Sequence, residues 1–182
     1  MDRFALFSEC LLVGVWITVA ALPLFTFPAA FAAGSRHLRR YLAGEHGGLR
    51  EFVADARTAA RGGWIVGAAV WAAAALLLLD LAAVRAGLPG GPLVGAVGII
   101  AMIGFLVAVM RAASCWEPGA HWPALLARSG RNTVTDPAGS LLLVCGMAVV
   151  VLSGALVLPL AVPVLGAVAA AATAVRQREL SR

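Results

Sequence analysis

The stretch LPLFTFPAAFAAGSRHLRRYLAGEHGG, Leu22–Gly48, determines how this chain is interpreted. It begins at the end of an apolar run, holds two prolines, and passes directly into a cluster of arginines. Because proline removes a backbone N–H, Pro23 and Pro28 predict a break near one end of an apolar helix. Short arginine-rich loops stay on the cytoplasmic side of membranes, so the arginines predict that this end of the helix faces the cytoplasm.

The composition of the whole chain indicates an integral membrane protein. Of the 182 residues, 62% are hydrophobic and 13% are charged, and the mean hydropathy is +0.93. Soluble domains are nearer half apolar. The length suits a single transmembrane helical domain over residues 1–182. The arginines flank apolar runs and do not line a polar face, so we expect no nucleic-acid binding despite the formal charge of +5.

Long apolar runs predict the membrane-spanning helices. A hydrocarbon core of about 30 Å is crossed by roughly 20 residues of helix. Four runs reach that length, and a fifth is shorter and rich in alanine. Pro159 and Pro163 lie where the fourth run meets the fifth and predict a tight helical hairpin. The runs are Cys10–Ala33, Trp64–Val84, Pro92–Met110, Gly139–Leu158 and Leu160–Val175.

The distribution of arginine favours five spans over four. With five spans, every dense arginine cluster falls on one side of the membrane, and only Arg3 and Arg85 fall on the other. We therefore expect an all-α bundle of five transmembrane helices, the first broken by proline, with the N-terminus outside and the C-terminus in the cytoplasm. A re-entrant fifth segment is the alternative. The first run is longer than the core of a signal peptide, about 7–15 residues, and is interpreted as a span.

The first arginine-rich loop carries an amphipathic pattern. Leu49, Phe52 and Val53 recur at helical spacing while the charged residues face elsewhere. This pattern predicts a short cytoplasmic amphipathic helix that lies on the membrane surface or against a partner. Gly62-Gly63 is expected to end this helix before the second span begins.

Glycines within the spans predict close helix packing, because small residues let helix backbones approach each other in lipid. The spacing Gly63-x-x-x-Gly67 is one such face. Further small faces are expected at Gly95, Gly98, Gly104 and Gly146.

Asp80 is the ionisable residue that lies within a predicted span. Charged groups inside a bilayer are costly and are by default candidates for function. Asp80 lies near the outer end of the second span, where it can reach the interface. We expect it to pair with Arg85 or Arg3, and proton or cation transport is the alternative.

The sequence carries no motif for catalysis, a cofactor or a metal. The histidines have no partner at helical spacing and are expected to be solvated loop residues, and the cysteines are far apart with no redox or metal-ligand spacing. We therefore expect a non-enzymatic protein without cofactor, metal or disulfide. The residues concerned are His37, His46, His121, Cys10, Cys115 and Cys145.

A short series of residues around the two prolines resembles a known family. The series is Leu22-Pro23, Thr26 and Pro28-Ala29, followed in the basic loop by Leu49-Arg50-Glu51-Phe52. This order resembles the YesL-like (DUF624) family of small bacterial membrane proteins, most clearly over residues 11–67. Many members have the order Thr-x-Gly-Pro-Ala, whereas this chain lacks the glycine and has one residue between Thr26 and Pro28. Leu125–Asn132 is similar to the second cytoplasmic segment of the family.

The resemblance implies a function. Family members are often encoded beside carbohydrate ABC transporters and glycan-degrading enzymes, which implies an accessory role in sugar uptake at the bacterial plasma membrane. The expected partners are the lipid bilayer and either ABC transporter subunits or a second copy of the chain. A small solute carrier acting by itself is the alternative, with the broken first helix lining its path.

Both lines of reasoning lead to a set of candidate residues. The hydroxyl of Thr26 is expected to bond a backbone carbonyl that proline leaves free. The arginines and the aromatic side chain of the loop are candidates for contact with a partner. The full set is Pro23, Thr26, Pro28, Arg39, Arg40, Phe52 and Asp80.

Overall fold

The computed structural model describes residues 3–45, 47–87, 90–156 and 161–180, and over these residues the chain folds into helices with no strand. This confirms the predicted all-helical class. The helices are α1 (Arg3–Ala20), α2 (Phe27–Leu42), α3 (Leu49–Arg85), α4 (Gly91–Ser114), α5 (Trp122–Thr135), α6 (Pro137–Leu156) and α7 (Ala161–Leu180).

The predicted first span is divided into two helices. The predicted break is confirmed, since α1 ends at Ala20 and α2 begins at Phe27. The chain then turns back instead of continuing across: Glu9 precedes the apolar run, His37 follows it, and their side chains form a hydrogen bond of 2.7 Å. Both ends of Cys10–Ala33 therefore lie on the same side of the structure, and one straight crossing over this range is not formed.

Helix α2 lies at the centre of the fold. It packs against α1, α3, α4 and α7. Every residue from Pro28 to Ser35 is buried, and four of these are alanines, which let the neighbouring helices approach closely. Phe31 fills the space between them. The segment between the prolines and the arginines is therefore the core of the protein.

Helix α3 is continuous over 37 residues, so the predicted break at Gly62-Gly63 is wrong. The two glycines instead make room for Trp122 of α5. A Cβ atom on Gly62 would lie 2.7 Å from Cδ1 of Trp122, and one on Gly63 would lie 3.2 Å from its Cζ2. The predicted separate amphipathic helix is the first part of α3. The protein covers its apolar face in part, since Phe52 is 2% exposed whereas Leu49 is 54% exposed.

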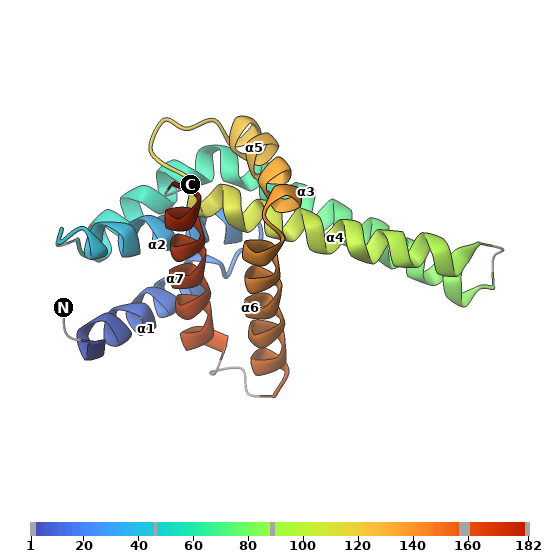
Figure 1. Cartoon of the computed structure of the whole chain (residues 1–182), viewed down its shortest axis with the longest axis horizontal. Coiled ribbons are helices and arrows are strands. Elements are labelled where there is room, and N and C mark those ends of the chain that lie inside the picture. The colour runs from blue at the N-terminus through green and yellow to red at the C-terminus, as the bar shows by residue number, and fades with distance from the viewer. Residues whose placement is uncertain (1–2, 46, 88–89, 157–160, 181–182) are drawn as a thin grey trace.

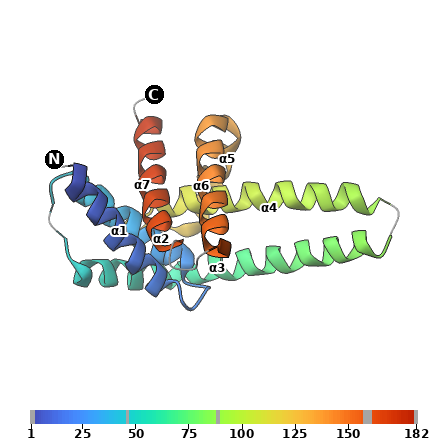
Figure 2. The same ribbon diagram turned by 90° about the horizontal axis from the view of Figure 1, so that it is seen from below.

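The second half of α3 and the first half of α4 form a helical hairpin that projects from the rest of the molecule (Figures 1 and 2). Its outward side chains are apolar and exposed, with Leu78, Leu93 and Ile100 each about 70% exposed. Among the described residues, α3 and α4 are the two helices long and apolar enough to cross a membrane, and α5 with α6 adds a third if that bent pair is one span.

Helices α6 and α7 run side by side and cross the direction of the hairpin steeply (Figures 1 and 2). Helix α7 continues to Leu180, beyond the predicted end at Val175. The apolar helices are compatible with a multi-pass membrane protein, but the predicted bundle of five transmembrane helices is not confirmed. Pro159, where a tight turn was predicted, lies outside the described residues.

Candidate interaction surfaces at the arginine-rich end

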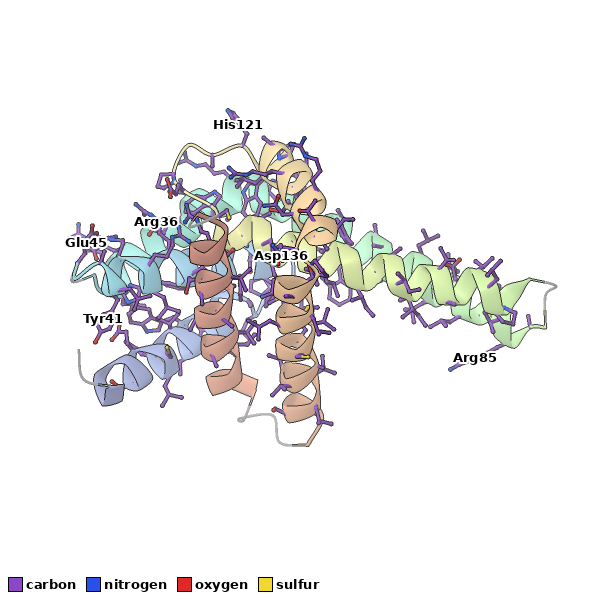
Figure 3. The ribbon with its side chains drawn as sticks, in the orientation of Figure 1. Arg36, Tyr41, Glu45, Arg85, His121 and Asp136 are labelled. Atoms are coloured by element: carbon purple, nitrogen blue, oxygen red, sulfur yellow. The ribbon has the colours of Figure 1, made fainter. Side chains whose placement is uncertain are left out.

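Charged residues gather at the end of the molecule opposite the hairpin tip. Arg36 and Glu45 lie there in Figure 3, whereas Arg85 lies at the tip. We call the second half of α2, the first half of α3, residues 115–121 and α5 the arginine-rich end. Its acidic side chains are mostly occupied by internal ion pairs, which are Arg36–Asp55, Arg40–Glu45, Arg40–Glu51 and Arg176–Glu117. His37 forms a further hydrogen bond with Glu9.

Arg39 joins α2 to the end of α4. Its guanidinium donates hydrogen bonds to the carbonyl oxygens of Ser114 and Trp116, the latter over 2.8 Å. Carbonyl groups at a helix C-terminus have no intrahelical partner and are stabilised by a cation. Burial, together with the positive charge of Arg176, lowers the pKa of Arg39 to about 10, so the side chain is still charged at neutral pH. Arg39 therefore holds the fold together.

Arg40 and Phe52 fix the connection between α2 and α3. The Nε atom of Arg40 lies 3.0 Å from the carboxylate of Glu45, and its Nη2 lies 3.7 Å from that of Glu51. Glu51 also accepts a hydrogen bond from the backbone N–H of Gly48 at the start of α3. The ring of Phe52 packs against Trp16, with 5.4 Å between ring centroids. The structure thus places Phe52 inside the protein and not on a contact surface.

His37 is buried, so its prediction as a solvated loop residue is wrong. Its side chain is 3% exposed and contacts the carboxylate of Glu9, while the ring of Trp16 packs against it edge-on at 5.2 Å. His121 is exposed and points away from the molecule, as predicted (Figure 3). His46 lies outside the described residues.

The break between α1 and α2 is held by Thr26. Its hydroxyl donates a hydrogen bond of 2.6 Å to the carbonyl of Ala20, which confirms the predicted bond. Pro23 lies exposed in the turn, and Pro28 is buried in the first turn of α2. The carbonyl of Phe25 packs directly against Gly67 of α3. The break is therefore anchored to α3.

Asp80 lies apart from the other candidates, far along the hairpin. Its carboxylate packs against Gly98 of α4, where an added Cβ would lie 2.9 Å from Oδ2. The part of the chain that the structure describes holds no ion pair between Asp80 and Arg85, and the side chain of Arg3 lies outside that part. The predicted candidates are thus distributed over the break, the end of α2 and the hairpin, and they do not form one site.

A buried charged cluster that the sequence reasoning missed lies at the bend between α5 and α6. The two helices meet at 104°. Nη2 of Arg111, which is 4% exposed, lies 3.0 Å from Oδ2 of Asp136, 3.1 Å from its backbone oxygen and 3.2 Å from Oγ of Ser140. Figure 3 shows Asp136 between α5 and α6. The sequence does contain one signal for this bend. Pro137 directly follows Asp136, and a proline in the first turn is typical of a helix start.

One exposed face of α3, which we call its outer face, carries three arginines that are available to bind a partner. Arg50, Arg57 and Arg61 are exposed, and at about 100° per residue they lie within about 20° of one face of the helix. None of them forms an ion pair with any residue that the structure describes. A first groove of about 580 Å³ lies on this face and is lined by Leu49, Arg50, Val53, Ala54 and Arg57.

A second groove, of about 590 Å³, lies further along α3, between Thr58 and Ala69. It is bounded by the middle of α3, the connection between α4 and α5, and the first turn of α5. Its lining residues are Thr58, Arg61, Gly62, Ile65, Val66, Ala69, Trp116, Gly119, Ala120, His121, Trp122, Pro123 and Leu126.

Neither a search for metal sites among the described residues nor the comparisons with known proteins gave a match. Over the residues that the structure describes, no group of three His, Cys, Asp or Glu side chains is placed to bind a metal ion. No protein-family model, curated protein or solved structure matches this chain. The resemblance to the YesL-like family therefore remains a prediction from the residues quoted above.

Proposed function

We propose that this chain is a non-enzymatic accessory protein of the bacterial plasma membrane that binds an acidic surface of a partner protein at its arginine-rich end, on the cytoplasmic side. The observation that carries the proposal is the first groove. Arg50 and Arg57 flank the apolar side chains of Leu49 and Val53 there and have no acidic partner among the described residues. An exposed apolar strip bordered by unpaired cations is complementary to an amphipathic, acidic segment.

The continuity of α3 supports this proposal. The exposed Trp64 begins the apolar part of the helix, and tryptophan favours the membrane interface. The preceding part, Leu49–Gly63, extends about 22 Å at 1.5 Å per residue. Because one helix contains both the arginines and the apolar hairpin, a partner bound there is held at a fixed position relative to the membrane.

The class of partner comes from the family resemblance. It favours subunits of a carbohydrate ABC-type uptake system, and a second copy of this chain is the other partner considered. The first groove does not distinguish between these two partners.

Co-purification tests the proposal. The protein, tagged after Arg182, is isolated from native membranes in mild detergent, and enriched proteins are identified by mass spectrometry. We expect transporter subunits to be enriched and to be released in about 1 M salt, where charges are screened beyond about 3 Å. Arg50→Gln with Arg57→Gln should abolish this enrichment.

Arg85→Gln is the matched control, because Arg85 is an exposed arginine of the same helix at its opposite end. It should leave the enrichment unchanged. Isolation of the wild type without any transporter subunit above background, or equal loss in the control, would contradict the proposal.

Solute transport by the protein itself is the competing function. It predicts a path lined by the broken helix, but the side chains of the break, such as Leu22 and Leu24, are exposed and line neither groove. Uptake of sugars into liposomes that contain only this protein would favour a carrier over an accessory role.

A further inference from the structure

The second groove combines a polar, basic end with an apolar end. Thr58 and Arg61 of α3 and His121 of the α4–α5 connection supply the polar groups. One turn further along α3, Ile65, Val66 and Ala69 supply an apolar wall. The ligand that matches this lining has a polar headgroup and an apolar chain.

The electrostatics of the groove select an anion. Its lining includes Arg61 and His121 but neither Asp nor Glu. Arg61 is exposed and makes no ion pair with any described residue. The basic end therefore offers an unneutralised guanidinium, and a phosphate group accepts hydrogen bonds from it.

The floor of the groove is rigid. It includes the indoles of Trp116 and Trp122, both of which are buried. The Nε1–H group of Trp122 donates a hydrogen bond of 3.1 Å to the carbonyl of Ala59, and the ring packs against Gly62. A ligand therefore meets a preformed surface and does not need to displace these side chains.

The apolar end of the groove opens onto the exposed apolar surface of the hairpin. Ile65 is 57% exposed, and the neighbouring Trp64 is 56% exposed. An acyl chain that leaves the groove along Ile65 and Ala69 would continue beside the hairpin, in the lipid that surrounds it. A soluble anion would leave this apolar wall unoccupied.

We propose that the second groove binds an anionic phospholipid, with its phosphate at Arg61 and its acyl chain along Ile65 and Ala69. This inference rests on insertion of the hairpin in the membrane, and it goes beyond partner binding. It depends on Arg61, whereas the partner surface depends on Arg50 and Arg57. The failure of one proposal is therefore distinguishable from the failure of the other.

Lipid retention tests the proposal. The full chain is equilibrated with equal amounts of phosphatidylglycerol and phosphatidylcholine in detergent micelles, and bound lipids are counted by native mass spectrometry. We expect phosphatidylglycerol to be retained in preference to phosphatidylcholine. Arg61→Gln should weaken this retention about fivefold, the effect of one basic residue near an anionic membrane surface.

Arg57→Gln is the matched control, since it removes the same charge from the same helix one turn away and outside the groove. It should leave lipid retention unchanged. Equal weakening by Arg57→Gln and Arg61→Gln would show a diffuse charge effect and overturn the proposal, as would equal retention of the two lipids.

A second variant tests the apolar end. Ala69 is exposed within the groove, so Ala69→Phe fills the space assigned to the acyl chain without removing a charge. Phosphatidylglycerol retention should fall while the helical circular dichroism signal stays unchanged. Retention that survives Ala69→Phe, or displacement of the lipid by an excess of inorganic phosphate or of an acidic peptide, would show an anion or peptide site and overturn the phospholipid assignment.

Discussion

At the scale of single residues, the close approach of helices depends on a few glycines. Gly67 is one clear case, because a Cβ atom added to it would lie only 2.0 Å from the carbonyl oxygen of Phe25. Gly34 has a comparable role against the side chain of Ile17, where the distance is 2.5 Å. The predicted role of small residues in helix packing is confirmed for Gly67 but not for Gly104, which has no neighbouring atom within 4 Å.

Gly67→Ala should therefore destabilise the protein by about 1–3 kcal/mol, since α3 and the α1–α2 break must move apart. Gly104→Ala is the control and should cost nothing, because alanine is the better helix former and meets no atom. The measurement is the midpoint of thermal unfolding in detergent. Equal midpoints for the two variants would contradict the packing shown for Gly67.

Thr26→Val removes the hydroxyl that bonds the carbonyl of Ala20 while keeping the size of the side chain. We expect a loss of about 1–2 kcal/mol, because the carbonyl is left without this donor. Thr26→Ser keeps the hydroxyl and should retain most of the stability in the same unfolding assay. Equal unfolding midpoints for the two variants would show that this hydrogen bond does not stabilise the break between α1 and α2.

The bond of Thr26 could be predicted from the sequence because its partner is six residues away and the prolines indicate where the helix opens. The contact of His37 with Glu9 could not be predicted, because it joins positions 28 residues apart. It depends on the reversal of the chain after α1, and residue types alone do not determine that reversal.

At the scale of elements, apolar runs predict well where helices form but not where one helix ends and the next begins. The third and fourth predicted spans, Pro92–Met110 and Gly139–Leu158, correspond to α4 and α6 within a few residues. Gly62-Gly63 was misinterpreted because glycine both breaks helices and permits close packing. The choice between these roles depends on Trp122, about sixty residues further along the chain.

Gly62→Ala distinguishes the two roles of this glycine. If Gly62 only loosened α3, alanine would stabilise the helix by up to about 1 kcal/mol. Because Trp122 lies where the new methyl group would go, we expect a lower unfolding midpoint instead. Combining Gly62→Ala with Trp122→Ala should remove this steric penalty, and a penalty that persists in the double variant would argue against the contact.

Arg111→Gln should weaken the joint between α5 and α6. It leaves the carboxylate of Asp136 without its buried cation, which typically costs about 3–5 kcal/mol. Asp136→Asn should be similarly damaging. In a double-mutant cycle, measured by unfolding in detergent, the two losses should be clearly less than additive. Additive losses would show that the ion pair does not couple the two helices.

At the scale of the whole molecule, helices from both ends of the chain contact the same region. Glu9 of α1 contacts His37, and Arg176 of α7 contacts Glu117, so both ends of the chain approach the arginine-rich end. The expectation of an outside N-terminus followed from counting Cys10–Ala33 as one crossing. A count of apolar runs cannot reveal a run that turns back on itself.

Both termini should therefore lie in the cytoplasm. Single cysteines are placed at Ser8 or after Arg182 in a variant that lacks the native cysteines. Each should resist an impermeant thiol reagent in intact cells and react after permeabilisation. A cysteine at the exposed Ala86, at the end of α3, should be labelled in intact cells. Labelling at Ser8 without permeabilisation would restore the outside N-terminus.

The unbroken course of α3 fixes an angle as well as a distance. Each residue of an α-helix turns the chain by about 100°, so the bearing of Arg50 and Arg57 around the helix axis is set by the number of residues between them and the hairpin. Deleting one residue from this interval would rotate the arginines about the axis of α3 by roughly a quarter of a turn. They would then point away from the proposed partner. The length of this segment is therefore as important for the proposed contact as the two arginines themselves.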